Sequence, residues 1–342
     1  MRFDTVPAPD RDAMDAALAH HGRLAKPAGS LGRLEALGVQ LAGISGSCPP
    51  PVPEPAVVAV FAADHGVVRS GVTPWPTEIT AAVVGGLAKE SAGISVLARQ
   101  MGARVIGVDV GIAGDIPASP LVLDRKVRRG TDDLSTGPAM TREDAEAAIA
   151  IGMDVAQQAV ADGAGCLITG EMGIGNTTPS AALIAAITGR PAADLTGRGT
   201  GIDDDMLRTK RKIVVDAVQR TQGLGPIDLL AEVGGLEIAA LCGFVIAGAQ
   251  LRIPVIVDGV ITLAATVVAD ALTAGAIRPY LVAGHRSVEP AATAALEHLG
   301  LDPVLDLSLR LGEGTGAMLA LPIVQAAARI LLEMATIEDL LG

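Results

Sequence analysis

The sequence predicts a doubly wound α/β fold with a mostly parallel sheet and a small helical subdomain. Half of the 342 residues are hydrophobic but only 1% are aromatic, so Ala, Val, Leu and Ile build the core. Such residues suit parallel strands that are buried on both faces. Short apolar runs alternate with helical patterns through the middle of the chain, which is typical of a parallel sheet. Helical patterns alone occupy its two ends.

Two segments near the N-terminus, residues 12–25 and 31–44, have the periodicity of amphipathic helices, and Asp10 or Asp12 can cap the first of them. A proline-rich linker, residues 48–56, separates these helices from the central part of the chain. The alternation of strands and helices begins beyond this linker.

Helical periodicity returns near the end of the sequence, in residues 316–334. We expect this segment to pack against the N-terminal helices. The predicted organisation is therefore a small helical subdomain formed by residues 1–48 and 316–342, and a parallel α/β domain formed by residues 49–315.

Five short apolar runs predict buried strands at residues 55–62, 104–110, 164–169, 253–258 and 279–283. Helical patterns separate them at residues 77–101, 141–161, 178–188, 204–221 and 259–274. This order indicates a Rossmann-like sheet, in which ligands bind outside the carboxyl ends of the strands. The unusual sequences AADHG, DVGIAGD, TGEMGIGNTTPS, DGVIT and GHRSVEPA follow the five strands in turn. A functional site is therefore expected at this edge of the sheet.

The charge and composition of the chain indicate which classes of partner and which cellular compartment to expect. A formal net charge of −12 and five aromatic residues argue against nucleic acid, which needs a basic surface and stacking rings. The longest apolar stretches, residues 238–249 and 259–269, are shorter than the ~20 residues of a membrane span. The N-terminus carries acids and no apolar segment, unlike a secretory signal. Cys48, Cys166 and Cys242 form no CxxC and are expected to be free thiols in the cytoplasm.

A glycine-rich segment leads from the third predicted strand into a helix. Gly170, Gly173 and Gly175 allow a sharp turn with uncovered backbone amides, and Thr177 or Thr178 can cap the helix. Exposed amides at a helix N-terminus bind anions without a basic side chain. The segment lacks the GK[ST] ending of a Walker loop and the GxGxxG of a dinucleotide site. The residues alone fit either a phosphate-binding loop or a plain tight turn.

Two charged side chains favour the phosphate interpretation. Glu171 lies within the glycine-rich segment, where a carboxylate is better explained by ribose hydroxyls or a base than by structure. Lys210 lies in a helix that begins with acids and continues with basic residues, most of which suit the helix dipole and solvent. One lysine that reaches inward would supply the local positive charge that this acidic chain otherwise lacks.

A second glutamate, Glu313, lies between Gly312 and Gly314 just before the last long helix. It is either an exposed loop residue or a group that a ligand can approach closely. Apolar neighbours such as Leu311 and Met318 would partly remove its carboxylate from water. A desolvated carboxylate is a better proton acceptor, so Glu313 is a candidate general base.

Other kinds of active site find little support. Asp64 and His65 could serve metal or acid–base chemistry, but the five histidines form neither HxxxH nor HExxH, so no metal site is expected. The chain has no GxSxG for a serine hydrolase. It also lacks GxGxxG with a downstream acid, which a dinucleotide oxidoreductase would need.

The chain resembles the nicotinate-nucleotide–dimethylbenzimidazole phosphoribosyltransferases of cobalamin assembly over nearly its whole length. Eight segments carry the resemblance in order: KPAGSLGRLE (26–35), AADHGV (62–67), VDVGI (108–112), GEMGIGNTTPSAA (170–182), VGGLEIAALCG (233–243), PVIVDG (254–259), RPYLVAGHRS (278–287) and RLGEGTGAMLALPIV (310–324). The resemblance implies transfer of ribose phosphate from nicotinate mononucleotide to a base nitrogen with inversion. It implies no metal or other cofactor, small-molecule substrates, and a homodimer.

The resemblance also implies roles for individual residues. Its catalytic base falls on Glu313. Its nucleotide- and phosphate-binding residues fall on Glu171, Gly173, Ile174, Gly175, Asn176, Lys210 and Ser287. The residues that we assign to the pocket for the acceptor base are Trp75, Val83, Met172 and Leu311.

Two positions of the base pocket depart from the family. Trp75 and Val83 stand where a serine and a glutamine are expected. Trp75, the only tryptophan, either packs a loop between two prolines or makes the pocket apolar, so that a flat ring is selected by stacking. The acceptor could therefore be dimethylbenzimidazole, another benzimidazole, a purine or a phenol. A non-catalytic nucleotide-binding protein on the same fold is a further alternative.

Overall fold

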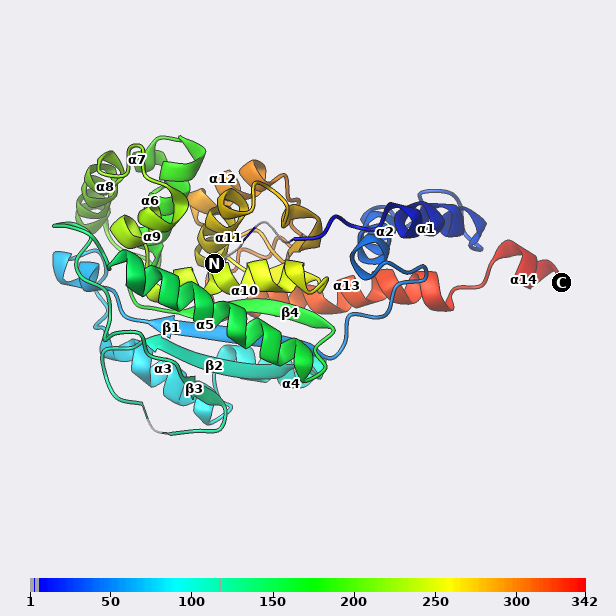
Figure 1. The fold of residues 1–342 in the computed structure, drawn as a ribbon, viewed down its shortest axis with the longest axis horizontal. Helices are drawn as coiled ribbons and strands as arrows, with labels where there is room; N and C mark the ends of the chain where they lie inside the picture. The colour runs from blue at the N-terminus through cyan, green and yellow to red at the C-terminus, as the bar shows by residue number, and fades with distance from the viewer. Residues whose placement is uncertain (1–2, 4–5, 117) are drawn as a thin grey trace.

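Six parallel strands form a single sheet in the order β3-β2-β1-β4-β5-β6 (Figure 1). The structure is a computed structural model that describes residues 3, 6–116 and 118–342. The strands are β1 Ala56–Ala63, β2 Arg104–Gly111, β3 Val122–Asp124, β4 Cys166–Met172, β5 Val255–Val257 and β6 Leu281–Ala283. The strand order reverses between β1 and β4, so a crevice opens outside the carboxyl ends of these two strands. The predicted doubly wound, parallel fold is confirmed.

Helices cover both faces of this sheet and also extend beyond it (Figure 1). The α-helices are α1 Arg11–Arg23, α2 Arg33–Ser45, α3 Glu78–Ala88, α4 Gly93–Met101, α5 Arg142–Ala161, α6 Thr177–Thr188, α7 Ala192–Leu195, α8 Asp204–Gln219, α9 Pro226–Val233, α10 Leu236–Gln250, α11 Val260–Leu272, α12 Pro290–Leu299, α13 Thr315–Glu333 and α14 Ile337–Leu341. Short 3₁₀ turns lie at Gly66–Ser70 and Arg278–Tyr280.

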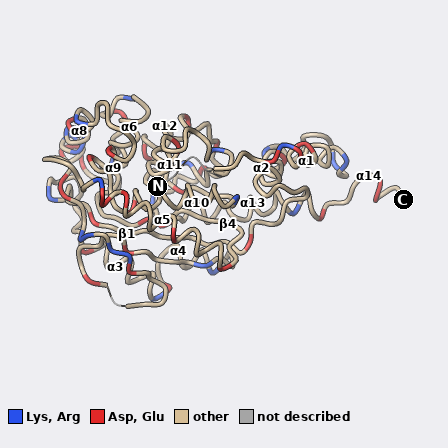
Figure 2. The backbone as a smooth tube through the Cα atoms, in the orientation of Figure 1, with Lys and Arg blue, Asp and Glu red and all other residues tan. Residues whose placement is uncertain are grey.

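The alternating side chains of β1 separate two hydrophobic cores. Val57, Ala59 and Phe61 face a layer that contains α5, α10 and α11, whereas Val58 and Val60 face α3, α4 and α13. All eight residues of β1 are buried, as expected for a central strand of a parallel sheet. The charged residues lie mainly on the outer segments around this core (Figure 2).

The predicted helix over residues 77–101 is wrong in one respect, because the structure divides it. Helix α3 ends at Ala88, and α4 begins at Gly93 with Ala92 as its extended N-cap. The break presents a new helix N-terminus, with free backbone amides, in the middle of this segment. One of these amides, that of Ile94, contacts the side chain of Glu313.

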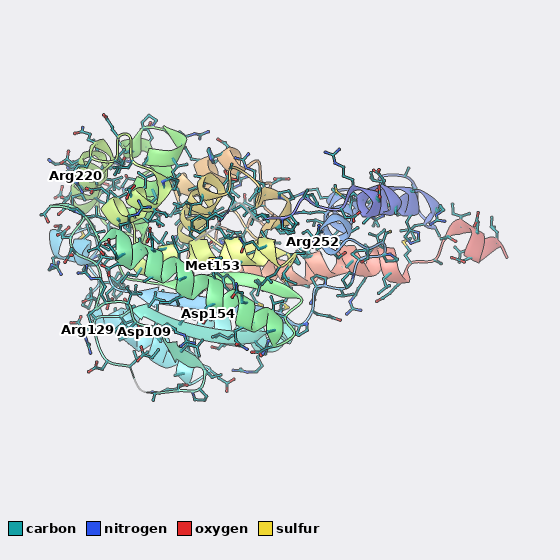
Figure 3. The ribbon with its side chains drawn as sticks, in the orientation of Figure 1. Asp109, Arg129, Met153, Asp154, Arg220 and Arg252 are labelled. Carbon is teal, nitrogen blue, oxygen red and sulfur yellow. The ribbon has the colours of Figure 1, made fainter. Side chains whose placement is uncertain are left out.

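Helices α1 and α2 pack against the distal part of α13, away from the sheet (Figure 1). Asp10 caps α1, since its Oδ1 accepts a hydrogen bond of 2.9 Å from the Ala13 amide. Arg252, labelled in Figure 3, joins this group of helices to the rest of the molecule by donating to the carbonyls of Ala8 and Ile44. Because α13 packs against both groups of elements, the predicted division into two domains stays a prediction.

Two helical stretches of the described residues are long and apolar enough to cross a membrane, judged by length and composition alone. Glu78–Met101 is the segment that the break divides into α3 and α4, and Thr315–Glu333 is α13, more than half of which is buried. The two apolar stretches singled out from the sequence are α10 and α11, both of which lie in the core.

Candidate active site

A cavity of about 130 Å³ opens at the carboxyl edge of β4, β5 and β6, where the sequence predicts a ligand. Its lining combines residues from five segments of the chain: Glu171, Met172, Gly173, Ile174, Asn176, Thr177, Gly199, Thr200, Asp258, Gly259, Val260, Ile261, His285, Ser287, Glu289, Arg310, Leu311 and Gly312. A smaller cavity of about 50 Å³ adjoins it and is bordered by Gly175 and Lys210. Most of the predicted nucleotide residues therefore lie together.

The glycine-rich segment forms a tight turn between β4 and α6. Gly175 has a φ of +89°, and a Cβ atom at Gly173 would lie only 2.7 Å from the carbonyl oxygen of Ala63. These two positions therefore need glycine. The amide of Ile174 donates to Thr80 Oγ1 over 3.2 Å, which fixes the loop against α3. The turn delivers the N-terminus of α6, whose N-cap position is Asn176, to both cavities, as an anion site requires.

Lys210 points inward from α8 and is almost fully buried. Its Nζ donates to Thr177 Oγ1 over 2.7 Å, so the positive charge lies against the first turn of α6. Burial lowers the pKa of Lys210 to about 8, although the charge of Glu289 opposes the shift. An anion bound at the N-terminus of α6 would compensate this buried charge.

Glu171 is buried at the end of β4, between the two functional loops. Burial raises the pKa of its carboxyl to about 8, despite the hydrogen bond of 2.5 Å that Asn176 Nδ2 donates to Oε2. A Cβ atom at Gly312, whose φ is +85°, would lie 2.5 Å from Oε1 of Glu171, so a side chain at this position would displace the Glu171 carboxyl and strain the backbone. The Glu171 carbonyl also accepts a hydrogen bond of 3.2 Å from the Glu313 amide.

Glu313 lies in a turn of three consecutive left-handed residues. The φ angles of Gly312, Glu313 and Gly314 are +85°, +61° and +87°. Such a conformation is unusual for a glutamate and marks a position that the surroundings hold. Its Oε2 accepts a hydrogen bond of 3.0 Å from the amide of Ile94 at the start of α4, and the side chain is buried. The carboxylate is thus turned towards α4, beside the cavity that Gly312 lines.

The loops after β5 and β6 add groups that the sequence did not single out. Asp258 Oδ1 accepts from the amide of Ala317 at 2.9 Å and lies 3.4 Å from His285 Nε2. Burial opposes protonation of His285, but Asp258 outweighs this effect and raises its pKa. Their positions after strands, in DGVIT and GHRS, are the signal that could have found them. Ser287 is buried and lines the cavity, and its role in binding the nucleotide stays a prediction.

The predicted base pocket is only partly assembled. Met172 and Leu311 line the 130 Å³ cavity beside the nucleotide residues. Trp75 is 46% exposed in the loop before α3, and Val83 is half-buried on α3. Neither lines the cavity, although Thr80 of the same helix contacts the glycine-rich loop. The roles of Trp75 and Val83 stay predictions.

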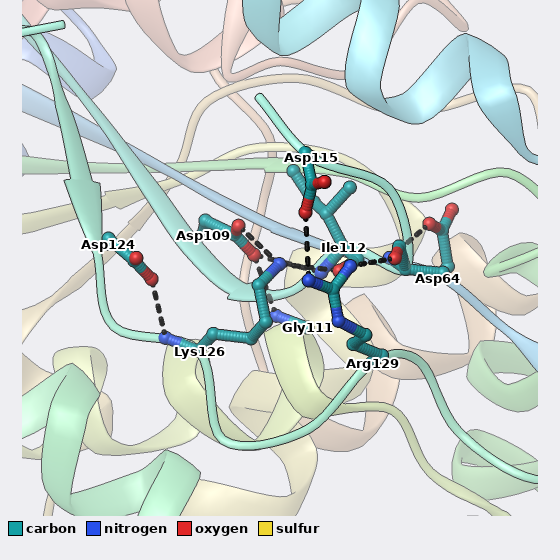
Figure 4. Close-up of polar contacts among 9 residues, drawn as sticks. Asp64, Asp109, Gly111, Ile112, Asp115, Asp124, Lys126 and Arg129 are labelled. Atoms are coloured by element: carbon teal, nitrogen blue, oxygen red, sulfur yellow. Dashed lines mark hydrogen bonds and ion pairs between the residues drawn. The ribbon is translucent and has the colours of Figure 1, made fainter. Parts of the chain in front are cut away.

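A polar network fixes the loop that follows β2 (Figure 4). The buried carboxylate of Asp109 accepts from the amide of Ile112 at 2.8 Å and from Lys126 Nζ at 2.6 Å. Asp64, at the end of β1, accepts from the amide of Ala113 at 2.8 Å. Burial raises the pKa of the Asp64 carboxyl. The network therefore holds the loops that follow β1 and β2 against each other.

No cluster of three or more His, Cys, Asp or Glu among the described residues has the arrangement of a metal site. The cavity is lined by the N-terminus of α6 and by Glu171, the adjoining cavity is lined by Lys210, and Glu313 lies next to Gly312 of the lining without lining the cavity itself. Such a set can hold an anionic sugar phosphate and accept a proton from a neighbouring ligand.

Known proteins are similar to this chain over nearly its whole length. A family model described as "Phosphoribosyltransferase" matches residues 6–340. The nicotinate-nucleotide–dimethylbenzimidazole phosphoribosyltransferase of Salinispora tropica is 50% identical over 96% of this chain and 95% of its own length. The enzyme of the same name from Geobacter sulfurreducens is 46% identical over 96% of this chain.

A solved structure is also similar. The crystal structure of CobT from Thermus thermophilus superposes with a TM-score of 0.93 at 44% identity, over 96% of this chain and 98% of that one. The chain therefore belongs to the nicotinate-nucleotide–dimethylbenzimidazole phosphoribosyltransferase family.

Proposed function

We propose that this protein transfers ribose 5-phosphate from nicotinate mononucleotide to dimethylbenzimidazole or a similar base. The products are the α-ribazole phosphate and nicotinate. The observation that carries the proposal is the left-handed turn at Glu313, which holds a buried carboxylate beside the cavity of the glycine-rich loop. A protein that only binds nucleotide has no need for a base held in this way.

The reaction breaks one bond at C1 of ribose and forms another. One nitrogen of the acceptor ring attacks C1, the bond from C1 to the pyridine nitrogen breaks, and the configuration inverts. The leaving pyridinium takes the bonding electrons and departs as a neutral ring. The other acceptor nitrogen loses its proton to the Glu313 carboxylate, so the acceptor ring does not become positively charged as the new bond forms. Correct placement of the two substrates supplies much of the remaining acceleration.

The donor nucleotide occupies the cavity between β4 and β6 in this proposal. Its phosphate lies at the N-terminus of α6, where Lys210 supplies the positive charge. Glu171 faces the ribose and is largely protonated at neutral pH, since burial raises its pKa to about 8. A protonated carboxyl can donate a hydrogen bond to a ribose oxygen. The proposed donor-binding residues are Glu171, Gly173, Ile174, Gly175, Asn176, Lys210 and Ser287.

The acceptor ring lies between Met172, Leu311 and the loop of Trp75. Both Met172 and Leu311 border the cavity on the side of Glu313, and they offer apolar surface to a flat ring. Trp75 and Val83 would complete an apolar wall if the loop before α3 closes over the ring. This pocket selects by shape, so dimethylbenzimidazole and related benzimidazoles are the expected acceptors.

The test is a transfer assay with defined substrates. Purified protein is incubated with nicotinate mononucleotide and, separately, each of several benzimidazoles, a purine and a phenol, and the products are identified by mass. We expect an α-nucleotide with dimethylbenzimidazole and release of one nicotinate per product. Product from a purine or phenol alone would reassign the acceptor. No nucleotide product with any benzimidazole would overturn the proposal.

The remaining assignments accompany this function. We infer that the partners are small molecules and a second copy of the chain in a homodimer, with neither nucleic acid nor a membrane involved. We place the reaction in the cytoplasm. Sedimentation of the purified protein tests the homodimer directly.

A further inference from the structure

A buried pair of side chains lies directly beneath the phosphate-binding loop and takes no part in the proposed chemistry. His65 follows β1, and Glu237 lies in the first turn of α10, 172 residues further along the chain. His65 Nε2 and Glu237 Oε1 are 2.6 Å apart, and both side chains are completely excluded from solvent. The pair therefore joins the end of β1 to a core helix.

Two glycines enclose this pair. A Cβ atom at Gly173 of the phosphate-binding loop would lie 3.1 Å from both His65 Nε2 and Glu237 Oε1. On the other side, a Cβ atom at Gly235 would lie 2.4 Å from His65 Cε1 and 2.8 Å from Glu237 Oε2. A side chain at either glycine would therefore meet the bonded atoms, so the backbone of the loop lies close to this bond. We expect a change in the length or direction of the bond to shift Gly173.

The pair is costly to bury, which makes a purely stabilising role a poor explanation. Removing two charges from water costs several kcal/mol per ion, and well-packed apolar side chains often stabilise as much. In addition, Glu237 Oε2 and His65 Nδ1 have no hydrogen-bond partner among the described residues. Unlike apolar side chains, such a pair fixes the distance between the end of β1 and α10, and it places a charge at a fixed position.

The charge of Glu237 also reaches the donor site. Burial and the charges of Glu237, Asp258 and Glu313 together raise the pKa of Glu171, against the hydrogen bond from Asn176. Glu237 also raises the pKa of His65 above its ordinary value, with help from Asp64 and against the effect of burial.

We propose that the His65–Glu237 pair is a positioning element that holds the phosphate-binding loop in its anion-binding shape and so sets the affinity for the donor nucleotide. This inference rests on the proposed phosphoribosyl transfer. Neither residue touches the substrate. Each acts through Gly173, which belongs to the turn that carries the N-terminus of α6.

The first variant, Glu237→Leu, removes the bond while leaving a side chain of similar size. Loss of one charge-assisted hydrogen bond to phosphate corresponds to a factor of about 10 to 100 in affinity. We expect KM and Kd for nicotinate mononucleotide to rise at least about tenfold, with kcat changed less than about threefold. The matched control is Asp270→Leu, because Asp270 is also buried in an ion pair, with Arg278, but in α11 and away from the loop. It should lower Tm and leave donor KM unchanged.

The conservative variant Glu237→Gln separates distance from charge. Glutamine can still accept from His65 Nε2, so most of the lost affinity should return. Because the charge of Glu237 helps to raise the pKa of Glu171, its loss should lower that pKa. The limb of the pH–rate profile that reports Glu171 should then shift to lower pH. If Glu237→Leu gives no folded protein, His65→Asn is the second variant, because its shorter side chain should not maintain the contact with Glu237 Oε1. Unchanged KM and Kd for the donor in His65→Asn would overturn the proposal.

Two further outcomes are informative. Glu237→Leu that lowers Tm as Asp270→Leu does, with donor KM unchanged, would show that the pair only stabilises the fold and would refute the inference. Donor Kd is measured by calorimetry, which needs no turnover. A wild-type protein that binds the donor but transfers nothing would therefore contradict the proposed function, while the variants would still report on the loop.

Discussion

Replacing Glu313 by glutamine tests the proposed mechanism at its centre. The structure makes this a clean change, because Glu313 Oε2 accepts a single hydrogen bond, of 3.0 Å, from the amide of Ile94. The amide oxygen of glutamine can accept the same bond, and the left-handed backbone at this position is kept. The fold and the donor site should therefore survive, and only the capacity to take a proton is lost.

The magnitude follows from the role assigned to the carboxylate. General bases contribute a factor of about 10² to 10⁴, so kcat should fall at least about 100-fold, which corresponds to about 2.7 kcal/mol of transition-state stabilisation. Donor Kd should change less than about threefold. The assay follows α-nucleotide formation by chromatography at saturating donor and base, with calorimetry for donor binding.

Glu90→Gln is the matched control. Glu90 is also a glutamate with a left-handed backbone, at a φ of +54°, but it is exposed and lies after α3, outside the cavity of the glycine-rich loop. Its replacement should leave kcat unchanged. A Glu313→Gln enzyme that keeps the wild-type rate would remove Glu313 from proton transfer. A variant that instead loses donor affinity would place the carboxylate in binding.

Three further predictions test the donor and base sites. Burial lowers the pKa of Lys210 to about 8, so its charge is lost as the pH rises through this value and donor KM should rise. Because the pKa of Glu171 is also raised to about 8, Lys210→Met should give a high KM that rises less steeply there than the wild-type KM, and the remaining pH dependence should report Glu171. Gly312→Ala would place Cβ 2.5 Å from Glu171 Oε1 and should reduce kcat/KM at least about tenfold. Its control is Gly300→Ala, because Gly300 also has a left-handed backbone, with a φ of +68°, but no atom lies near its added Cβ. The control should cost roughly 1–2 kcal/mol of stability and keep activity. Trp75 is the only tryptophan, so base binding should quench the protein's tryptophan fluorescence, and emission unchanged at saturating base would exclude Trp75 from the pocket.

The sheet could be predicted where its strands are long and buried. The sequence predicts a strand at residues 55–62, and β1 occupies Ala56–Ala63, because an unbroken apolar run between a proline linker and Asp64 is typical of a buried strand. Strand β3 was missed, since three partly exposed residues at a sheet edge leave no pattern. Helix α10 was also missed. It is buried on nearly all sides, so its apolar residues show no helical period.

In the candidate site, features formed by neighbouring residues could be predicted from the sequence, and contacts between distant residues could not. The glycine-rich loop and the turn of Glu313 could be recognised because neighbouring residues create them. The hydrogen bond from Ile94 to Glu313 could not, since it depends on a break between α3 and α4 that the periodicity does not reveal. The contact of His65 with Glu237 was equally hidden, because only the folded sheet brings these distant residues together.

Helix α13 has a consequence for how the enzyme comes into being during synthesis. The strands that shape the donor cavity all precede Glu313 in the chain, and α13, which follows it, packs its far end against α2. Proteins are made from the N-terminus and fold as their segments emerge. A nascent chain that ends before Glu313 also lacks α13, which covers the face of the sheet that Val58 and Val60 line. The last long helix therefore completes the core and brings the proposed general base into place in the same step, so an incomplete product would lack both.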